Sequence, residues 1–325
     1  MLDLKFQSEG YNTKLEERNY DVIILGGGPT GLTAGIYTGR ALLKTLIIEE
    51  NMIGGEASST ELIENYPGFP DGISGMELTE RMKKQVEKFG AKIVINHTDK
   101  VVLTSKIKSV KTDSEEFQSK AIIIATGSSP KSLNIPGERT FKGRGVSYCA
   151  TCDAPFFKSK DIAVIGAGSS GIQEGLFLLE YVKSIKFIEF LPYMTAEKIL
   201  QERIKKRENV EFFLNHKLLS INGDQTVESI TTENRGTGEK RDIPISGVFV
   251  FVGLKPNTEL FKDSIELDKE GFIVADEHLR TSLEGVFAAG DVRKKILRQV
   301  ATAVGDGALA AFSAKTYLER LKLKD

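Results

Sequence analysis

The feature that most constrains this chain is an internal repeat. Two segments, DVIILGGGPTGLTAGIYTGR at 21–40 and DIAVIGAGSSGIQEGLFLLE at 161–180, align with each other without a gap. Each consists of a short apolar run of buried-strand type, a glycine-rich turn and a helical pattern. One Gly-x-Gly-x-x-Gly turn is a weak signal. Two of them in the same strand–turn–helix setting predict an α/β protein with two nucleotide-binding domains, each a three-layer, Rossmann-like fold.

In the first repeat, each glycine has a physical reason. Gly26 permits the tight turn, Gly28 lets a pyrophosphate approach the backbone, and Gly31 permits close packing of the helix on the strand. Free N–H groups at the start of the helix then hold the phosphates. The next strand, TLIIEE, brings Glu49 to the distance beyond the turn at which a carboxylate of this fold binds a ribose. A surface acid that merely ends the strand is the alternative.

Two further segments complete the pattern of a flavin-binding domain. AIIIATGSSP at 121–130 is typical of a strand followed by a turn, and GVFAAGDV at 285–292 of a strand ending in Gly-Asp. We expect Asp291 to orient the ribityl and phosphate groups. A discontinuous FAD-binding domain is therefore expected over residues 1–129 and 253–325. Residues 130–252 are expected to form an inserted NAD(P)-type domain, with hinges in the Gly-, Ser- and Pro-rich segments TGSSPKS and VGLKPN.

Composition argues against several classes of function. The 44 basic residues balance 45 acidic residues to a net charge of −1, so no global positive field would attract nucleic acid. The longest apolar runs fall far below the ~18 residues that a membrane-spanning helix needs. Residues 1–20 are polar and charged, unlike a secretory signal, so a cytoplasmic location without membrane attachment is expected.

The only cysteines, Cys149 and Cys152, form a C-x-x-C just before the second repeat. Cysteines at this spacing at a helix start can close a small disulfide, and the helix N-terminus lowers the pKa of a thiol. Asp153 follows at once and is placed to shuttle a proton. Half of a zinc site would need about two more ligands, and the histidines are scattered, so no metal site is expected. Two buried structural thiols are the other alternative to a redox-active pair beside a flavin.

Over nearly its whole length the chain resembles the low-molecular-weight thioredoxin reductases. The resemblance rests on GGGPTG, GGEAS, IENYPGFP, ATGSSP, YCATCD, GAGSSG, FAAGDV and RQVATAVGDG. It implies a homodimeric FAD enzyme that reduces thioredoxin, with Cys152 against the flavin, Cys149 attacking the thioredoxin disulfide and Asp153 as acid/base. The residues that it implies for FAD binding are Gly26, Gly28, Pro29, Thr30, Gly31, Glu49, Glu56, Asn65, Thr126, Gly127, Asp291, Gln299 and Val300.

Two positions depart from the family pattern. In GGEAS, Glu56 stands where the family usually has a flavin-contacting Gln, which puts that hydrogen bond in doubt. At 189–195, EFLPYMT replaces the His-Arg-Arg and the later Arg with which the NADPH-dependent family binds the 2′-phosphate. No cation of this segment is in reach of a 2′-phosphate, and Glu189 would repel it, so NADPH is not expected as the donor.

Two interpretations of this segment remain. Glu189, at the end of the strand that follows the second repeat, is placed to bind the 2′-OH of NADH. Alternatively, the bulky run 190–194 fills the adenosine groove and nucleotide binding is lost. The IE-aromatic-x-P pattern resembles the pyridine-nucleotide-independent branch of the family, in which one group takes electrons from ferredoxin. We favour loss of nucleotide binding, with ferredoxin as the donor.

A basic segment, DVRKKILR, offers a docking surface for an acidic ferredoxin beside the FAD site; a solvated basic face is the plain alternative. Its cations are Arg293, Lys294, Lys295 and Arg298. The alternative function is an NADH-dependent thioredoxin or peroxiredoxin reductase that uses the same cysteines.

Overall fold

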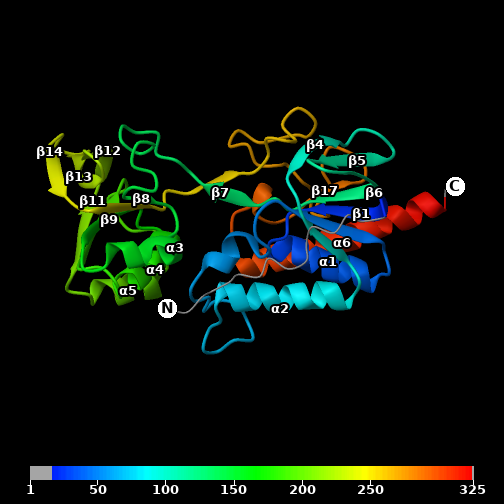
Figure 1. Cartoon of the computed structure of the whole chain (residues 1–325), viewed down its shortest axis with the longest axis horizontal. Helices are drawn as coiled ribbons and strands as arrows, with labels where there is room; N and C mark the ends of the chain where they lie inside the picture. The colour runs from blue at the N-terminus through cyan, green and yellow to red at the C-terminus, as the bar shows by residue number, and fades with distance from the viewer. Residues whose placement is uncertain (1–16, 324–325) are drawn as a thin grey trace. The chain divides into compact units, whose positions relative to one another are not determined.

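The computed structural model describes residues 17–323 and divides into two compact units (Figure 1). Unit 1 runs to Ser129 and resumes at Lys255, and unit 2 comprises Pro130–Leu254. The chain passes between the units through β7 (Ser128–Pro130) and β16 (Leu254–Pro256), which form a two-stranded sheet. Unit 1 is thus assembled from two separate stretches of sequence.

A seven-stranded sheet forms the centre of unit 1. Its strand β6 pairs with β1 on one side and, along its length, with β5 and then β17 on the other. Apolar runs such as VIIL in β1 and AIII in β6 are fully buried, as expected for parallel strands covered on both faces. The parallel strands are β3 (Lys92–Ile95), β2 (Thr45–Glu49), β1 (Asn19–Leu25), β6 (Glu116–Ile124) and β17 (Val286–Ala288), and the antiparallel ones are β5 (Lys108–Thr112) and β4 (Thr98–Val102).

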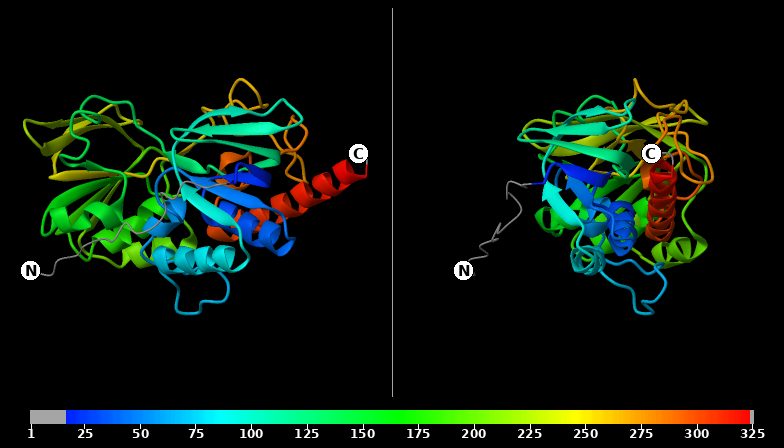
Figure 2. Two further views of the ribbon diagram at one scale, coloured as in Figure 1. Left: turned by 45° about the vertical axis from the view of Figure 1, so that its right-hand side comes forward. Right: turned by 90° about the vertical axis from the view of Figure 1, so that its right-hand side faces the viewer.

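Helices cover one face of this sheet (Figure 2). Ile24, Ile47 and Ile123 of the sheet pack there with apolar residues of all three long helices of the unit. The neighbouring residues Ile23, Leu46 and Ile122 point to the opposite face, where the segment 261–292 covers them. The helices are α1 (Pro29–Arg40), α2 (Gly75–Lys88) and α6 (Val300–Lys322), and the short 3₁₀ turns are η1 (Gly55–Ser59) and η3 (Gly290–Val292).

Unit 2 contains a second, five-stranded parallel sheet and a three-stranded antiparallel sheet. The parallel strands in spatial order are β11 (Val210–Leu214), β10 (Ser184–Glu189), β9 (Asp161–Ile165), β15 (Gly247–Val250) and β8 (Val146–Ser147). The antiparallel strands are β12 (His216–Gly223), β13 (Val227–Asn234) and β14 (Lys240–Pro244). The helical segments are α3 (Ala150–Asp153), η2 (Ala154–Phe157), α4 (Ser169–Leu178) and α5 (Lys198–Lys205).

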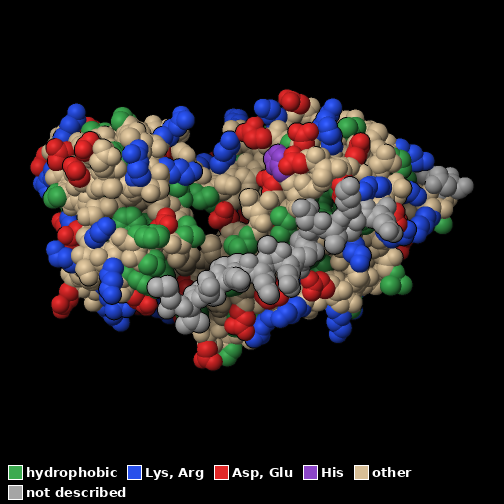
Figure 3. All heavy atoms as spheres, viewed as in Figure 1, with side chains coloured by type: hydrophobic (Ala, Val, Ile, Leu, Met, Phe, Trp, Pro, Cys, Tyr) green, Lys and Arg blue, Asp and Glu red, His purple; other side chains and the backbone are tan. Residues whose placement is uncertain are grey.

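The predicted α/β class, with a Rossmann-like parallel sheet in each half of the repeat, is confirmed. On the face shown in Figure 3, Lys and Arg side chains are interspersed with Asp and Glu, in keeping with the near-zero net charge. Among residues 17–323, no helix is long and apolar enough to cross a bilayer.

Candidate active site

The turn between β1 and α1 has no room for side chains at two of its glycines. Gly26 has φ +107°, and a Cβ atom there would lie 2.3 Å from the Ala125 carbonyl oxygen. A Cβ on Gly31 would lie 1.8 Å from the Gly26 oxygen. At Gly28, by contrast, the nearest atom to a Cβ would be 3.9 Å away, so the backbone there is open to a ligand. The turn therefore has the tight and open positions that a pyrophosphate-binding loop requires.

The start of α1 is available for an anion. Gly28 is the N-cap and makes no side-chain cap hydrogen bond, Pro29 is the first helical residue, and Thr30 follows. Glu49, at the end of β2, lies beside the turn: its Oε2 accepts from the Gly27 N–H at 2.6 Å and its Oε1 from the Asn51 N–H at 3.0 Å. Each carboxylate oxygen keeps a further lone pair, so Glu49 is oriented and can still accept from ribose hydroxyls.

Other predicted FAD residues are brought together from distant parts of the sequence. Asn65 Nδ2 donates to Gln299 Oε1 at 3.1 Å, and Gln299 is the N-cap of α6, whose first residue is Val300. Thr126 is held by Asn257, which accepts from its hydroxyl and donates to its carbonyl, each at 2.8 Å. The Asn257 N–H also donates to the carbonyl of Gly127, which has φ +65°, at 3.1 Å. Sequence reasoning missed Asn257, because nothing in the segment VGLKPN singles it out.

Asp291 carries a buried polar atom without a hydrogen-bond partner. Its Oδ1 makes none among the described residues and only approaches Lys295 Nζ at 3.5 Å; Arg298 Nε, in the same segment, is likewise unpaired. Burial raises the pKa of Asp291, although Lys295 acts in the opposite direction. A buried unpaired group costs about 1–3 kcal/mol, so such atoms are expected where a ligand supplies the partner. With the open Gly28 and the oriented Glu49, these atoms fit a hydroxyl- and phosphate-bearing cofactor such as FAD.

Glu56, the departure from the family pattern, lies in η1 and is exposed as a whole residue. Even so, desolvation of its carboxyl group raises the pKa of Glu56. The Glu56 carboxyl oxygens can accept a hydrogen bond as the Gln oxygen does, but a carboxylate lacks the amide donor of Gln.

The basic segment predicted as a docking surface is not a free basic patch. Asp306 of α6 accepts from Arg293 Nε at 2.8 Å, Arg293 Nη2 at 2.9 Å and Lys295 Nζ at 3.3 Å, and the Lys295 side chain is only 6% exposed. Arg298 lies over the Phe272 ring at 4.0 Å. Lys294 is the only one of the four that is exposed. The docking surface stays a prediction with less support, because the counter-ion, Asp306, comes from another element; its only sequence signal is an acid inside the apolar run AVGDGALAAF.

The predicted disulfide between Cys149 and Cys152 is formed, at the start of α3. Cys149 is the N-cap, and its Sγ accepts from the Cys152 N–H at 3.3 Å and lies 3.4 Å from Thr151 Oγ1. Ser147 Oγ accepts from the Cys149 N–H and donates to the Cys149 carbonyl, each at 3.1 Å. Cys149 is half-buried and Cys152 exposed. The sulfur of Cys149 thus has the donors that would stabilise a thiolate.

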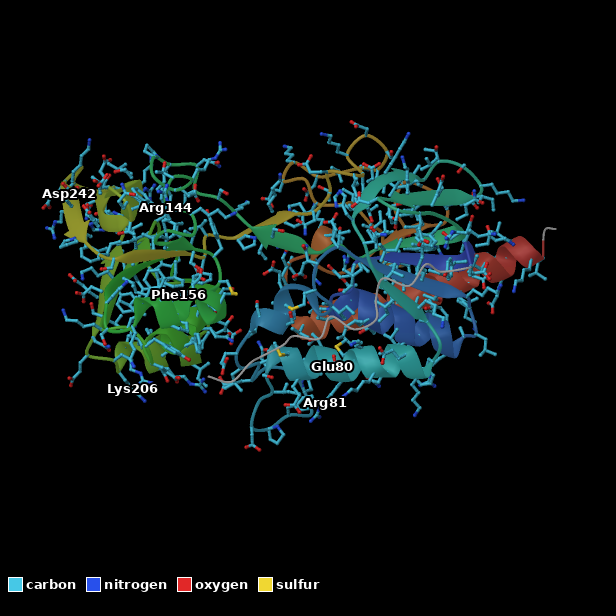
Figure 4. All side chains as sticks on the ribbon, viewed as in Figure 1. Glu80, Arg81, Arg144, Phe156, Lys206 and Asp242 are labelled. Atoms are coloured by element: carbon cyan, nitrogen blue, oxygen red, sulfur yellow. A yellow bond between two sulfur atoms is a disulfide. The ribbon has the colours of Figure 1, made fainter. Side chains whose placement is uncertain are left out.

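A cavity of about 930 Å³ in unit 2 reaches the residues beside the disulfide. Asp153, Arg144 and Phe156 are among its lining residues, and Figure 4 labels the last two. The Phe156 side chain is 72% exposed, unusual for so large an apolar residue. Through Asp153 the cavity adjoins the residue that directly follows Cys152, and its lining combines apolar and charged side chains.

Tyr148, next to Cys149, is tied to a buried acid that sequence reasoning missed. Its hydroxyl donates to Glu138 Oε1 at 2.5 Å, and Glu138 also accepts from the N–H groups of Leu133 and Asn134 at 2.7 and 2.6 Å. Burial, together with the Glu138 carboxylate, raises the pKa of Tyr148 to about 12. This group of hydrogen bonds fixes the backbone that leads into the disulfide.

The second glycine turn repeats the geometry of the first. Gly166 has φ +102°, and its Cβ would lie 2.3 Å from the Phe251 oxygen, while that of Gly171 would lie 2.1 Å from the Gly166 oxygen. Glu189, at the end of β10, is buried; its Oε2 accepts from the Ala167 N–H at 2.6 Å and its Oε1 from the Leu191 N–H at 2.9 Å. Gly166, Gly171 and Glu189 each stand 140 residues after their counterparts in unit 1, which are Gly26, Gly31 and Glu49.

The segment 190–194 is only partly packed: Met194 lies against the apolar core of unit 2, whereas the two aromatic side chains are exposed. Phe190 is 50% exposed and Tyr193 58% exposed, so neither side chain is buried in the domain. A cation also lies closer than predicted: the Arg235 guanidinium stands over the Phe190 ring at 3.6 Å. The expectation that no cation of the segment 189–195 is in reach of a 2′-phosphate does not extend to Arg235, which comes from a different part of the chain.

Comparison with known proteins gives a consistent picture. Residues 20–307 match the family model described as pyridine nucleotide-disulphide oxidoreductase. A thioredoxin reductase of Peptoclostridium litorale is 42% identical, over 94% of this chain and 99% of the relative. The solved thioredoxin reductase of Lactococcus lactis is 40% identical, with a TM-score of 0.91 over 93% of this chain and 99% of that one. That of T. acidophilum is 37% identical, with a TM-score of 0.89 over 94% and 100%.

A solved ferredoxin-flavin thioredoxin reductase of Clostridium acetobutylicum is also similar, at 26% identity and a TM-score of 0.50 over 94% of this chain and 99% of that one. Its sequence identity to this chain is lower than that of the Peptoclostridium litorale, Lactococcus lactis and T. acidophilum proteins. Its TM-score is also lower than those of the two solved structures from Lactococcus lactis and T. acidophilum. The names of the three nearer proteins specify no electron donor.

Proposed function

The chain belongs to the pyridine nucleotide-disulphide oxidoreductase family, and within it to the FAD-dependent thioredoxin reductases, and from this premise we propose that its donor is a reduced pyridine nucleotide, NADH in preference to NADPH. Reduction of thioredoxin through the Cys149–Cys152 disulfide follows from the family itself. The identity of the donor does not, and it rests on the geometry of unit 2.

The observation that carries the proposal is the equivalence of the two glycine turns. Glu189 accepts from the Ala167 N–H at 2.6 Å as Glu49 accepts from the Gly27 N–H at 2.6 Å. Glu189 is buried, and its carboxylate is fixed beside the second glycine turn as that of Glu49 is fixed beside the first. Its two backbone hydrogen bonds offset the cost of burying the charge, and each carboxylate oxygen keeps a lone pair that can accept from a ribose hydroxyl.

Glu189 also supports the preference for NADH. A carboxylate at the end of this strand accepts hydrogen bonds from the 2′- and 3′-hydroxyls of a ribose, whereas it repels a 2′-phosphate. The arginines with which the NADPH-dependent proteins hold that phosphate are absent from 189–195. Charge-assisted hydrogen bonds contribute about 1.5–3 kcal/mol each, so the loss of two would weaken NADPH binding by a hundredfold or more.

Bound FAD would supply two-electron transfer between the donor and the disulfide, and it would be held by Gly28, Glu49 and Asp291. The protein's own step is thiol–disulfide exchange. The Cys149 thiolate attacks one sulfur of the thioredoxin disulfide, which forms a mixed disulfide and releases the second sulfur as a thiolate. Cys152 then attacks Cys149 Sγ, re-forms the Cys149–Cys152 disulfide and releases the other thioredoxin sulfur. Asp153, lining the cavity beside them, is proposed to hold and transfer the proton.

Ferredoxin is the second candidate donor. It is favoured by the similarity to the ferredoxin-flavin thioredoxin reductase of Clostridium acetobutylicum and by the absence of the arginines. The basic segment does not favour ferredoxin, because its Arg293 and Lys295 are paired with Asp306. A peroxiredoxin remains the alternative acceptor.

The deciding experiment is anaerobic mixing of the oxidised, FAD-loaded protein with NADH, NADPH and reduced ferredoxin in turn, following the loss of visible flavin absorbance. We expect NADH to bleach the flavin at lower concentration than NADPH. A Glu189→Gln variant should narrow that difference, because it removes the repulsion of the 2′-phosphate. Bleaching by ferredoxin alone would contradict the proposal and establish the second candidate. Turnover with thioredoxin and with a peroxiredoxin, measured in parallel, ranks the two acceptors.

A further inference from the structure

Arg235 lies next to the predicted nucleotide site although it is far from that site in sequence. It follows β13, at the turn of the hairpin whose other strand, β14, carries Asp242, labelled in Figure 4. Its backbone N–H donates to the Asn215 carbonyl at 2.8 Å, and the Asn215 N–H donates to the Leu191 carbonyl at 2.8 Å. The hairpin turn is therefore joined to the loop that follows β10 and Glu189.

The guanidinium of Arg235 is held in one orientation. It stands 3.6 Å from the centroid of the Phe190 ring, and its Nη1 donates to the Phe190 carbonyl at 3.0 Å and approaches Asn215 Oδ1 at 3.4 Å. No hydrogen bond or ion pair engages Nε or Nη2 within residues 17–323. Those two groups form the edge with which arginine binds a phosphate through two parallel hydrogen bonds.

Resting on the proposed function, we propose that Arg235 is a specificity-determining residue that binds the 2′-phosphate of an adenine nucleotide. In this type of fold the residue at the end of the second strand faces the ribose 2′ position, and a nearby arginine accommodates a 2′-phosphate. Arg235 contacts the residue that directly follows Glu189 and is itself exposed. It supplies from a separate hairpin the cation that the segment 189–195 lacks.

The opposite role, in which Arg235 closes the site against nucleotides, is too weak to account for donor choice. Arg235 is exposed, and an exposed cation–π pair resists displacement by only about two- to fivefold in affinity. Such a lid would open for any ligand that binds in the micromolar range. A pre-oriented guanidinium with a free edge, by contrast, gains affinity from each phosphate oxygen that it contacts.

Glu189 and Arg235 then act in opposite directions on the same ligand position. Glu189 favours the free ribose hydroxyls of NADH, while Arg235 restores part of the affinity for NADPH. Removal of Arg235 should weaken binding of a 2′-phosphorylated nucleotide by at least about tenfold. It should leave a nucleotide without that phosphate within about twofold.

The test is calorimetric titration of the full-length, FAD-loaded protein with 5′-AMP and with 2′,5′-ADP, which differ only in the 2′-phosphate. Arg235→Ala should selectively lose affinity for 2′,5′-ADP, and Arg235→Lys should recover part of it, because lysine keeps the charge without the planar edge. Arg241→Ala is the matched control, since Arg241 lies on the same hairpin but is ion-paired with Glu239 at 2.8 Å.

The outcomes separate this inference from the function on which it rests. If the wild-type protein binds both nucleotides and Arg235→Ala changes neither affinity, the role of Arg235 is refuted while the nucleotide donor stands. If Arg235→Ala increases the affinity for both nucleotides, Arg235 closes the site against them and the inference is wrong. If the wild-type protein binds neither nucleotide, the proposed pyridine-nucleotide donor is refuted, and the proposed role of Arg235 is refuted as well.

Discussion

Cys149 and Cys152 have different surroundings although they share one disulfide. The Cys149 sulfur accepts from the Cys152 N–H and lies near the Thr151 hydroxyl, and these contacts would stabilise its thiolate after reduction. We therefore expect Cys149→Ser to abolish thioredoxin reduction while the purified protein stays yellow with FAD. Cys152→Ser is the matched control and should trap thioredoxin as a mixed disulfide on Cys149. If the Cys149→Ser variant trapped thioredoxin instead, Cys152 would be the residue that attacks thioredoxin and Cys149 the one that resolves the mixed disulfide.

Tyr148 makes a pH-dependent contribution to stability that can be worked out in sign. Its folded-state pKa is raised to about 12 from an ordinary value of 10.0, so the folded state binds the phenolic proton more tightly than the unfolded state does. The stabilisation is therefore fully present below pH 10 and is lost as the pH rises toward 12. Tyr148→Phe should remove this component. Denaturant unfolding of both proteins across that range measures it; parallel curves would contradict the assignment.

At the scale of elements, Asp306 joins α6 to the segment that follows β17. Its carboxylate accepts from the Gly290 N–H at 2.9 Å and from Nε and Nη2 of Arg293. Burial by itself raises the pKa of Asp306, but its pairing with Arg293 and Lys295 outweighs burial, and the net shift is downward. Its stabilisation is therefore present above the ordinary Asp pKa and is lost as the pH falls below it.

Asp306→Asn should leave the nearly buried Lys295 with only the more distant Asp291, at 3.5 Å, as a charge partner. Removal of one member of a buried ion pair costs about 3–5 kcal/mol, and we expect the lower end because the Arg293 side chain is 20% exposed. Urea unfolding at neutral pH measures the loss, and the difference from wild type should shrink in acid. Lys294→Ala, on the exposed neighbour, is the control and should change stability by less than about 0.5 kcal/mol.

The elements that sequence reasoning predicted are those whose signal is local. Gly26 and Gly31 could be identified because any side chain at either position collides with backbone, so a short motif is sufficient. Arg235 and the pairing of Arg293 could not be identified, because each depends on a contact between elements that are far apart in sequence. The same limit explains the basic segment: charge can be counted along a chain, but its neutralisation by Asp306 depends on tertiary packing. Glu49 and Glu189 are intermediate between local motifs and long-range contacts. Each lies beyond its glycine turn in sequence, but the strand–helix–strand unit fixes the spacing between the turn and the end of the next strand, so both could be predicted.

At the scale of the whole molecule, the resemblance to the family leads us to expect a homodimer. Sedimentation of the FAD-loaded protein at micromolar concentration should give a species of twice the chain mass of 35.8 kDa. Dilution toward nanomolar concentration should leave that species intact if the dimer is the working form. A single species at 35.8 kDa would refute the expectation without affecting the assignments at Cys149 and Glu189.

The division of unit 1 between two stretches of sequence has a consequence for biosynthesis. While the ribosome is translating residues 130–254, β17 and α6 do not yet exist, so β6 lacks one neighbour and α1 lacks one of the two helices against which it packs. Unit 2 is continuous and can fold as soon as it emerges from the exit tunnel. The first unit to be translated is thus the last to be completed, and its apolar strands stay incompletely covered until α6 is released. A message truncated before α6 would yield a folded disulfide unit attached to a half that cannot close around its flavin.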